Sequence, residues 1–177
     1  MARTKKNVST EIYNDVKEAK ENKDIIKEKD ISDSDEVVIV SLIPNVSYKD
    51  NKNGDYYKWD EIGHEELMQF SVVKDMYRNY RGYFENLWIR PKDENVVNKL
   101  NLNRLYKKYD YLIDIKNYTK DNIEFICSEI ELMNSRNSNL KFALFSRIVD
   151  SVQKEEITDF SVIKMLSKKF NLDLLNN

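Results

Sequence analysis

The sequence predicts an α+β protein in which a small antiparallel sheet of three to four strands (about 37–89) is followed by a C-terminal helical bundle. Three observations lead to this prediction. Residues 37–43 (VVIVSLI) form an apolar, β-branched run of strand length. Residues 91–177 repeat apolar side chains at helical spacing. The chain of 177 residues also has only 3 glycines and 2 prolines, too few for a fold with many tight turns.

The chain divides by composition into a charged N-terminal arm, residues 1–36, and a single α+β domain, residues 37–177. The arm carries 8 Lys/Arg and 10 Asp/Glu residues, so it buries too little apolar surface to offset its ordering entropy alone. Ile12 and Val16 form a weak apolar stripe along it. Two interpretations stay open, a solvated tail and an arm that orders against a neighbouring subunit. The domain consists of a sheet-rich half (37–90) and a helical half (91–177).

Strands are expected where β-branched or aromatic residues lie between turn signals. Pro44 ends the first strand, and Gly54 gives the hairpin loop the backbone freedom it needs. Gly63 ends a second turn. The expected elements are a strand at 37–43, a hairpin of 46–49 and 55–59 around the loop 50–54, a turn at 60–63, a strand at 65–71 and a short strand at 87–89.

Helices are expected where apolar residues recur every three to four positions after a capping residue. Ser71 is an N-cap candidate for a helix at 72–81, and Gly82 then suits the left-handed residue that ends it. Thr119 and Thr158 are further N-cap candidates. The expected helices of the helical half are 93–102, 103–113, one with Ile123, Ile126, Cys127 and Ile130 inward, 139–153, and a last helix with Phe160, Ile163, Leu166 and Phe170 inward.

No pattern in the sequence points to catalysis, a metal or a cofactor. His64 is the single histidine, and without a second His or Cys at ligand spacing it is expected to be a turn residue in solvent. Cys127 lies on the inward face of a predicted helix, where a thiol packs as a small apolar group. The glycines are isolated, so no glycine-rich loop can hold a phosphate. We therefore expect no enzyme activity, no catalytic or metal site, no cofactor and no small-molecule substrate.

The charge and hydropathy of the chain argue against two further classes of partner, nucleic acid and membranes. The net charge of −2 is too balanced to predict binding to nucleic acid, so such a partner is not expected. No segment approaches the roughly 18–20 consecutive apolar residues that cross a bilayer. The basic start of the chain is not followed by an apolar stretch, so no secretory signal and no membrane association are expected.

A series of aromatic residues is the most unusual local feature of the sequence, and Arg78, Arg81 and Arg90 are interleaved with it. Three interpretations stay open: core packing with polar tips at the surface, a protein interface, and a platform for stacking bases. The series comprises Tyr48, Tyr56, Tyr57, Trp59, Tyr77, Tyr80, Tyr83, Phe84 and Trp88. The candidate interface residues are Ile12, Val16, Tyr77, Tyr80, Tyr83 and Trp88.

Residues 41–89 and 96–102 resemble a pattern found in small structural-module proteins of tailed bacteriophages, and residues 162–175 (VIKMLSKKFNLDLL) are similar to the end of such proteins. In that pattern a strand ending in Ser-Leu leads to a hairpin ending in Trp, a glycine turn, a strand, a helix with Met, a Phe before Trp-Ile, and a helix ending in Leu. The matching positions are Ser41-Leu42, Trp59, Gly63, Met76, Phe84, Trp88-Ile89 and Leu100.

This resemblance implies a virion structural protein in the head–tail connector or tail region, from a phage with an AT-rich genome such as a crAss-like phage. It implies a multi-copy assembly held by protein–protein contacts, with other virion proteins and copies of the same chain as partners. The expected location is the virion, and the host cytoplasm before assembly. The alternative function is a small phage nucleic-acid-binding or regulatory protein, built on the helical half.

Overall fold

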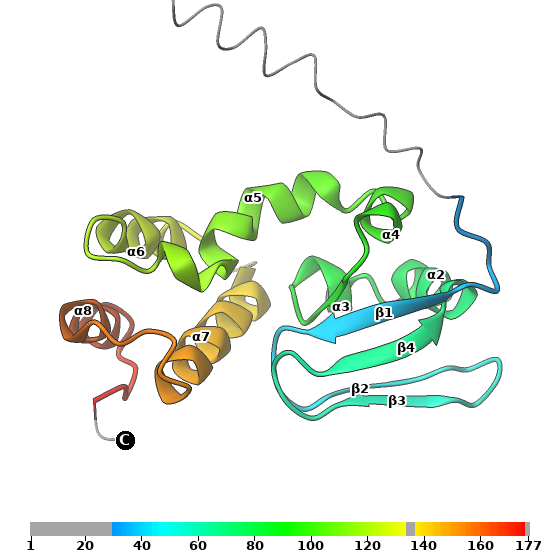
Figure 1. Cartoon of the computed structure of the whole chain (residues 1–177), viewed down its shortest axis with the longest axis horizontal. Coiled ribbons are helices and arrows are strands. Elements are labelled where there is room, and N and C mark those ends of the chain that lie inside the picture. Colours follow the sequence, from blue (N-terminus) through cyan, green and yellow to red (C-terminus); the bar gives the residue numbers. More distant parts are fainter. Residues whose placement is uncertain (1–29, 134–136, 176–177) are drawn as a thin grey trace, which may run out of the picture. The chain divides into compact units, whose positions relative to one another are not determined.

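The computed structural model describes residues 30–133 and 137–175. The described residues from Ile31 onward form one compact unit, in which strands come first and helices later (Figure 1). The predicted α+β fold class is confirmed. In chain order the elements are β1 (Glu36–Ser41), β2 (Val46–Lys49), β3 (Tyr56–Trp59), β4 (Glu65–Gln69), α2 (Phe70–Asn79), α3 (Gly82–Glu85), β5 (Ile89–Pro91), α4 (Glu94–Lys99), α5 (Asn103–Ile113), the 3-10 helix η1 (Ile115–Asn117), α6 (Ile123–Glu131), α7 (Ser138–Gln153) and α8 (Phe160–Phe170).

The strands form a three-stranded antiparallel sheet in the order β4-β1-β5 and a separate two-stranded sheet of β2 and β3. The β-branched run of β1 occupies the centre, where Ile39 is paired with Glu66 of β4 and with Pro91 of β5. Ile39 has no exposed surface, because both neighbouring strands and the core enclose it. One edge of this sheet is the three-residue strand β5, which ends in Pro91.

The β2–β3 hairpin is attached to the larger sheet by one buried side chain. Trp59 ends β3 with no exposed surface, and its indole Nε1 donates a hydrogen bond of 2.9 Å to the carbonyl of Ile39. In Figure 1 the hairpin lies below β1 and β4, whereas α2 and α3 lie above them. At the hairpin tip, Asp50 accepts hydrogen bonds from the backbone N–H groups of Lys52 and Asn53. The predicted hairpin is confirmed, with β3 beginning one residue later than expected.

The turn between β3 and β4 is held by Ser41, the last residue of β1. Its hydroxyl donates to the carbonyl of Glu61, its N–H donates to the carbonyl of His64 at 3.0 Å, and its carbonyl accepts from the N–H of Gly63 at 3.0 Å. Gly63 adopts a φ of 85°, a conformation that costs a side chain energy. The turn predicted at residues 60–63 is therefore confirmed.

We expect Gly63→Ala to lower the free energy of unfolding by about 1–2 kcal/mol, because an alanine pays the left-handed backbone cost even though nothing lies within 4 Å of the added methyl group. Gly82→Ala is the matched control. Gly82 opens a helix and the added methyl meets only the Asn86 side chain, at 3.2 Å, so a change of less than about 1 kcal/mol is expected. Urea denaturation measures both variants. Equal losses for the two would contradict the assignment of strain to Gly63.

Three predictions about the segment between β4 and β5 are wrong. The helix begins at Phe70 instead of residue 72, so Ser71 lies inside it and does not cap it. The backbone carbonyl of Asp33, which precedes β1, accepts the Ser71 N–H at 3.0 Å. Gly82 begins α3 rather than ending α2 in the left-handed conformation. The last strand covers residues 89–91 instead of 87–89, because Leu87 has a φ of 57° and stands in a turn.

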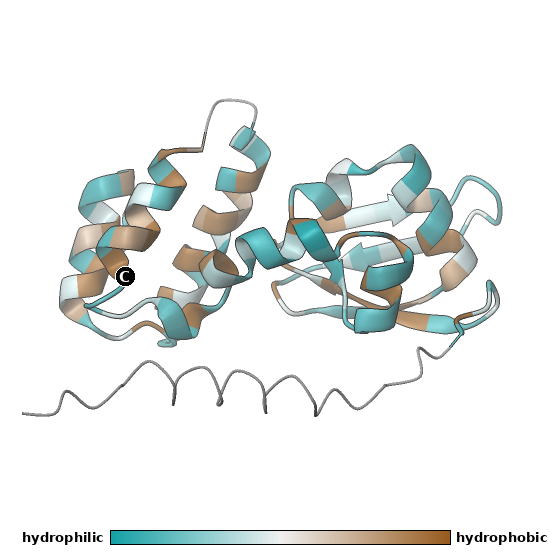
Figure 2. Cartoon of the chain, turned by 90° about the horizontal axis from the view of Figure 1, so that it is seen from above, coloured by the Kyte–Doolittle hydropathy of each residue, from teal (hydrophilic) through white to brown (hydrophobic). Residues whose placement is uncertain are grey.

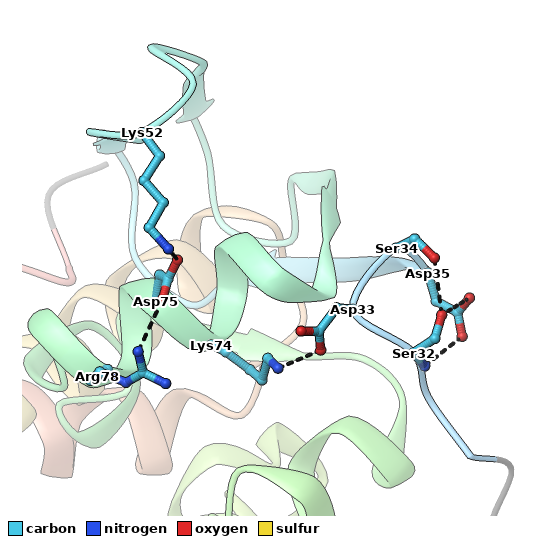
Figure 3. A network of polar contacts seen from close by, with 8 residues as sticks. All are labelled: Ser32, Asp33, Ser34, Asp35, Lys52, Lys74, Asp75 and Arg78. Carbon is cyan, nitrogen blue, oxygen red and sulfur yellow. Dashed lines mark hydrogen bonds and ion pairs between the residues drawn. The ribbon is translucent and has the colours of Figure 1, made fainter.

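Polar contacts join residues 32–35 and the hairpin tip to α2, as Figure 3 shows. Lys74 of α2 pairs with Asp33, and Ser32 donates to the carboxylate of Asp35 at 2.8 Å. On the neighbouring side of α2, Asp75 accepts from Lys52 of the hairpin loop, and this pairing lowers the pKa of the Asp75 carboxyl. These contacts place the segment before β1 against the sheet-rich half.

In the helical half, α6 packs against α8 and α5 against α7. Figure 2 shows hydrophobic and hydrophilic residues alternating along these helices, as the spacing of apolar residues predicts. The expected helices at 103–113 and 139–153 are confirmed as α5 and α7, which starts one residue earlier.

The predicted caps of α6 and α8 are wrong. Asn122 precedes α6, and Thr119 takes part only through its carbonyl, which accepts the Ile123 N–H at 2.9 Å. Asp159 instead of Thr158 caps α8, with Oδ1 accepting the Ser161 N–H at 2.9 Å, and hydrogen bonding from Ser161 lowers the pKa of Asp159 to about 2. Phe160 is 66% exposed rather than inward, since it directly follows this cap.

Arg90 connects the sheet-rich half to α5. Its guanidinium leaves β5, pairs with Asp110 at 2.7 Å and with Glu94 at 3.5 Å, and lies 4.7 Å from the ring centre of Tyr106. Asp110 and Tyr106 both belong to α5. One side chain therefore anchors the end of the sheet to the first long helix of the helical half.

Candidate protein-interaction surfaces

His64 lies in the turn where the sequence places it, half-buried rather than in open solvent. Its Nδ1 accepts the backbone N–H of Asp60 at 3.1 Å, and its Nε2 lies 3.8 Å from a carboxylate oxygen of Glu66. These contacts fix the turn between β3 and β4. Within residues 30–133 and 137–175, no group of three or more His, Cys, Asp or Glu side chains is placed to hold a metal ion.

Cys127 occupies the core of the helical half, as its position in the sequence predicts. It is 1% exposed on the inward side of α6, next to the buried residues Ile126 and Ile130. Burial raises the pKa of its thiol from 9.0 to about 11. A thiol in this state is a poor nucleophile at neutral pH, because the thiolate is the reactive form.

We expect the native protein to resist alkylation of Cys127 by iodoacetamide at pH 8. The raised pKa alone reduces the thiolate fraction by roughly a hundredfold, and burial blocks access as well. Mass spectrometry of the labelled chain, with a guanidinium-unfolded sample as control, measures the effect. Labelling at the same rate in both samples would show that α6 does not protect the thiol.

The tyrosine cluster, defined as Tyr48, Tyr57, Tyr80 and Tyr83, is the densest aromatic group of the sheet-rich half. Tyr48 is 6% exposed at its centre, and its ring centre lies 6.4 Å from that of Tyr57, 6.1 Å from Tyr80 and 6.3 Å from Tyr83. The Tyr83 hydroxyl donates to the carbonyl of Ser47 at 2.8 Å. Burial raises the pKa of Tyr48 to about 12, so its phenol stays neutral at physiological pH.

Two of the three interleaved arginines lie over aromatic rings of the same chain. Arg81 lies 5.2 Å from the ring centre of Tyr77, and Arg90 is paired with Asp110 and stacked on Tyr106. Arg78 makes a peripheral contact of 3.5 Å with Asp75. The series is thus arranged mainly as an internal packing unit with a charged rim.

The predicted interface residues in the sheet-rich half have different surroundings. Tyr80 is 44% exposed, and it is the one member of the tyrosine cluster with a largely open ring. Tyr77 is half-buried against Phe84, with ring centres 5.6 Å apart. Tyr83 and Trp88 are half-buried against each other, at 5.5 Å. Ile12 and Val16 lie outside the described residues, and an interface role for all six residues stays a prediction.

A second surface lies on the helical half, where α5 and α6 each expose three residues on one face. We name it the α5–α6 surface and define it as Arg104, Lys108 and Tyr111 of α5 with Phe125, Glu129 and Leu132 of α6 and its C-cap. In both sets the residues are spaced i, i+4 and i+7, so they follow one side of their helix.

The apolar members of the α5–α6 surface are well exposed, and two of them are in contact. Tyr111 is 38% exposed, Phe125 54% and Leu132 78%. The rings of Tyr111 and Phe125 meet edge to face, with centres 5.6 Å apart. Lys108, Glu129 and Leu132 also border a groove of 270 Å³ between the helices. Large apolar side chains gathered in this way mark sites of association more reliably than scattered ones.

The sequence does contain a signal for this surface, although the candidate site residues do not include it. Phe125 stands directly between Glu124 and Ile126, one position away from the inward side of its helix. Tyr111 is similarly displaced from the inward stripe that Tyr109 and Leu112 follow. A large aromatic residue at an outward helical position is therefore the feature that identifies the site.

Comparisons of the chain with models of protein families, with curated proteins and with solved structures found no match. Among the helices of the described residues, none has the length and apolar character needed to span a membrane.

Proposed function

We propose that this chain is a non-enzymatic structural component of a tailed-bacteriophage virion, present in several copies in the head–tail connector or tail region. It acts through contacts with other virion proteins and with copies of itself. It resides in the host cytoplasm until assembly places it in the particle. The resemblance of residues 41–89 and 162–175 to phage structural modules supplies the virion part of this proposal.

The observation that carries the interaction part of the proposal is the α5–α6 surface. Single exposed apolar residues are common on protein surfaces and need no partner. Tyr111, Phe125 and Leu132 differ because all three are large and exposed on the same two helices, and the rings of Tyr111 and Phe125 are in contact. Burying them against another protein removes this apolar surface from water, which is the dominant favourable term in association.

The experiment that tests the proposal is quantitative mass spectrometry of density-purified virions. The expected result is co-purification of this chain with the particle at a fixed ratio of several copies per virion. An abundant non-virion protein from the same infected cells is the matched control, and it should disappear on purification. Loss of the chain together with that control would contradict a virion role.

The alternative, a small nucleic-acid-binding or regulatory protein, has one observation in its favour. Arg104, Lys107 and Lys108 form an exposed basic stretch on α5. The neighbouring Glu129 and the net charge of −2 oppose a nucleic-acid backbone at this site. We expect no shift of DNA or RNA in a gel assay at low salt. Binding that weakens steeply as salt rises would favour the alternative instead.

A further inference from the structure

We infer that the α5–α6 surface is a two-fold contact between two copies of this chain. This inference rests on the proposed assembly role and names the partner of one surface in it. Three features carry it: exposed apolar residues, opposite charges on the two helices, and the same order of an aromatic residue followed by a charged residue along both.

The charges of the α5–α6 surface are divided between the helices. Arg104 and Lys108 are on α5, and Glu129 is on α6. Within the part of the chain that the structure describes, none of these three residues forms an ion pair. Among the described residues these three charges have no partner of the opposite sign, although the Lys108 ammonium lies 5.0 Å from the ring centre of Tyr109. The surface therefore offers two positive charges on α5 and one negative charge on α6.

The aromatic and charged residues also follow each other in corresponding order along the two helices. Tyr111 lies beside Phe125, and Lys108 borders the same groove as Glu129 and Leu132. The two helices thus run in opposite directions across this groove. Going away from the aromatic pair, α5 presents Lys108 at the level where α6 presents Glu129.

A two-fold axis running along the groove places α5 of each copy on α6 of the other. In that arrangement Lys108 of each copy faces Glu129 of its partner, and Tyr111 faces Phe125. Every contact occurs twice, as an isologous interface requires. A partner of uniform charge would match either Arg104 and Lys108 or Glu129 but not both, so the separated charges favour a second copy as the occupant.

The exposed apolar residues on either side of the Lys108–Glu129 level supply affinity, and the charges supply register. Aromatic residues that become fully desolvated are the usual hot spots of interfaces, and complementary charges mainly select the partner and its orientation. Leu132 is the most exposed apolar residue of the α5–α6 surface and borders the groove of 270 Å³, so the surface is concave beside this side chain. Reversing the charges of Lys108 and Glu129 therefore tests the proposed orientation of the two copies directly.

The test uses sedimentation velocity of the full chain over a range of concentrations. We expect a reversible dimer for the unaltered chain. Phe125→Ala should raise the dimer dissociation constant at least about tenfold, since an interface aromatic is lost. Phe160→Ala is the matched control, because Phe160 is also an exposed phenylalanine but begins α8, and it should leave the constant unchanged.

Charge reversal tests the register. Lys108→Glu and Glu129→Lys should each weaken the dimer at least about tenfold, because two like charges then face each other twice. An equimolar mixture of the two variants should form a heterodimer, in which each reversed charge meets its opposite. The double variant K108E/E129K should also recover self-association. Lys164→Glu, an exposed change on α8, is the control for charge alone.

Three results would overturn the inference: a chain that stays monomeric at its highest soluble concentration, a dimer that Phe125→Ala and Phe160→Ala weaken equally, or single charge variants that fail to pair in the mixture. Circular dichroism of each variant verifies that it is folded. If virions contain the chain but the purified protein stays monomeric, only the proposed two-fold contact is ruled out. If the purified protein dimerises but is absent from virions, only the proposed virion role is ruled out.

Discussion

Replacing Trp59 with alanine is expected to lower the free energy of unfolding by about 3–5 kcal/mol. Trp59 has no exposed surface, and its indole N–H donates to the Ile39 carbonyl at 2.9 Å. The substitution leaves a cavity between the hairpin and the central strand and removes the hydrogen bond that joins them. Equilibrium unfolding in urea, followed by far-UV circular dichroism, measures the loss.

Two further variants separate the contributions at this position. Trp59→Phe retains most of the apolar volume but removes the donor, so a smaller loss of about 1–3 kcal/mol is expected. Tyr56→Ala, on the same strand but 62% exposed, should change stability by no more than about 0.5 kcal/mol. If Trp59→Ala proved as harmless as Tyr56→Ala, the hairpin would not depend on Trp59 for its attachment.

Leu166→Ala is expected to cost about 2–5 kcal/mol and to destabilise the whole described unit, not only its last helix. Leu166 has no exposed surface in α8, which packs on α6. Both tryptophans, Trp59 and Trp88, belong to the sheet-rich half, so their fluorescence reports on that half alone. Circular dichroism at helical wavelengths reports on all helices.

The two signals should show the same midpoint in the Leu166→Ala variant, because Arg90 joins β5 to α5 and residues from Ile31 onward form one compact unit. Phe160→Ala is the control for a change in α8 that removes no buried contact. An early loss of helical signal with unchanged tryptophan fluorescence would mean that the two halves unfold separately.

Where the sequence predicts the fold correctly, the decisive interactions are local or follow from periodicity. The β-branched run at 37–43 covers β1 except for its first residue, Glu36, and the apolar spacing of residues 103–113 matches α5 to the residue. Gly54 and Gly63 both adopt positive φ values, of 78° and 85°, at the two predicted turns. These features depend on neighbouring residues, which a single sequence displays directly.

The incorrect predictions arise where a distant segment decides a local boundary. The start of α2 depends on carbonyl groups of Asp33 and Asp35, which precede β1 in the chain and accept N–H groups of Ser71 and Phe70. Gly82 resembles a helix end locally, but the short α3 begins there. No pattern within a few residues of these positions contains that information.

The candidate interaction surface also depends on contacts between segments that are distant in the sequence. Tyrosine and tryptophan at positions 77–88 stand out by composition, yet the structure uses several of them to pack against one another. Tyr111 and Phe125 are 14 positions apart and become neighbours only when α5 and α6 fold beside each other. Their outward helical positions were visible in the sequence, but their proximity was not.

The short strand β5 makes one edge of the three-stranded sheet a poor template for further strands. Open sheet edges invite strand-by-strand addition of further chains, which leads to fibres without a defined end. Pro91 has no N–H group to donate, and a three-residue strand offers too short a template for stable pairing. Strand addition at the β5 edge is therefore disfavoured, which leaves β4 as the longer edge of this sheet.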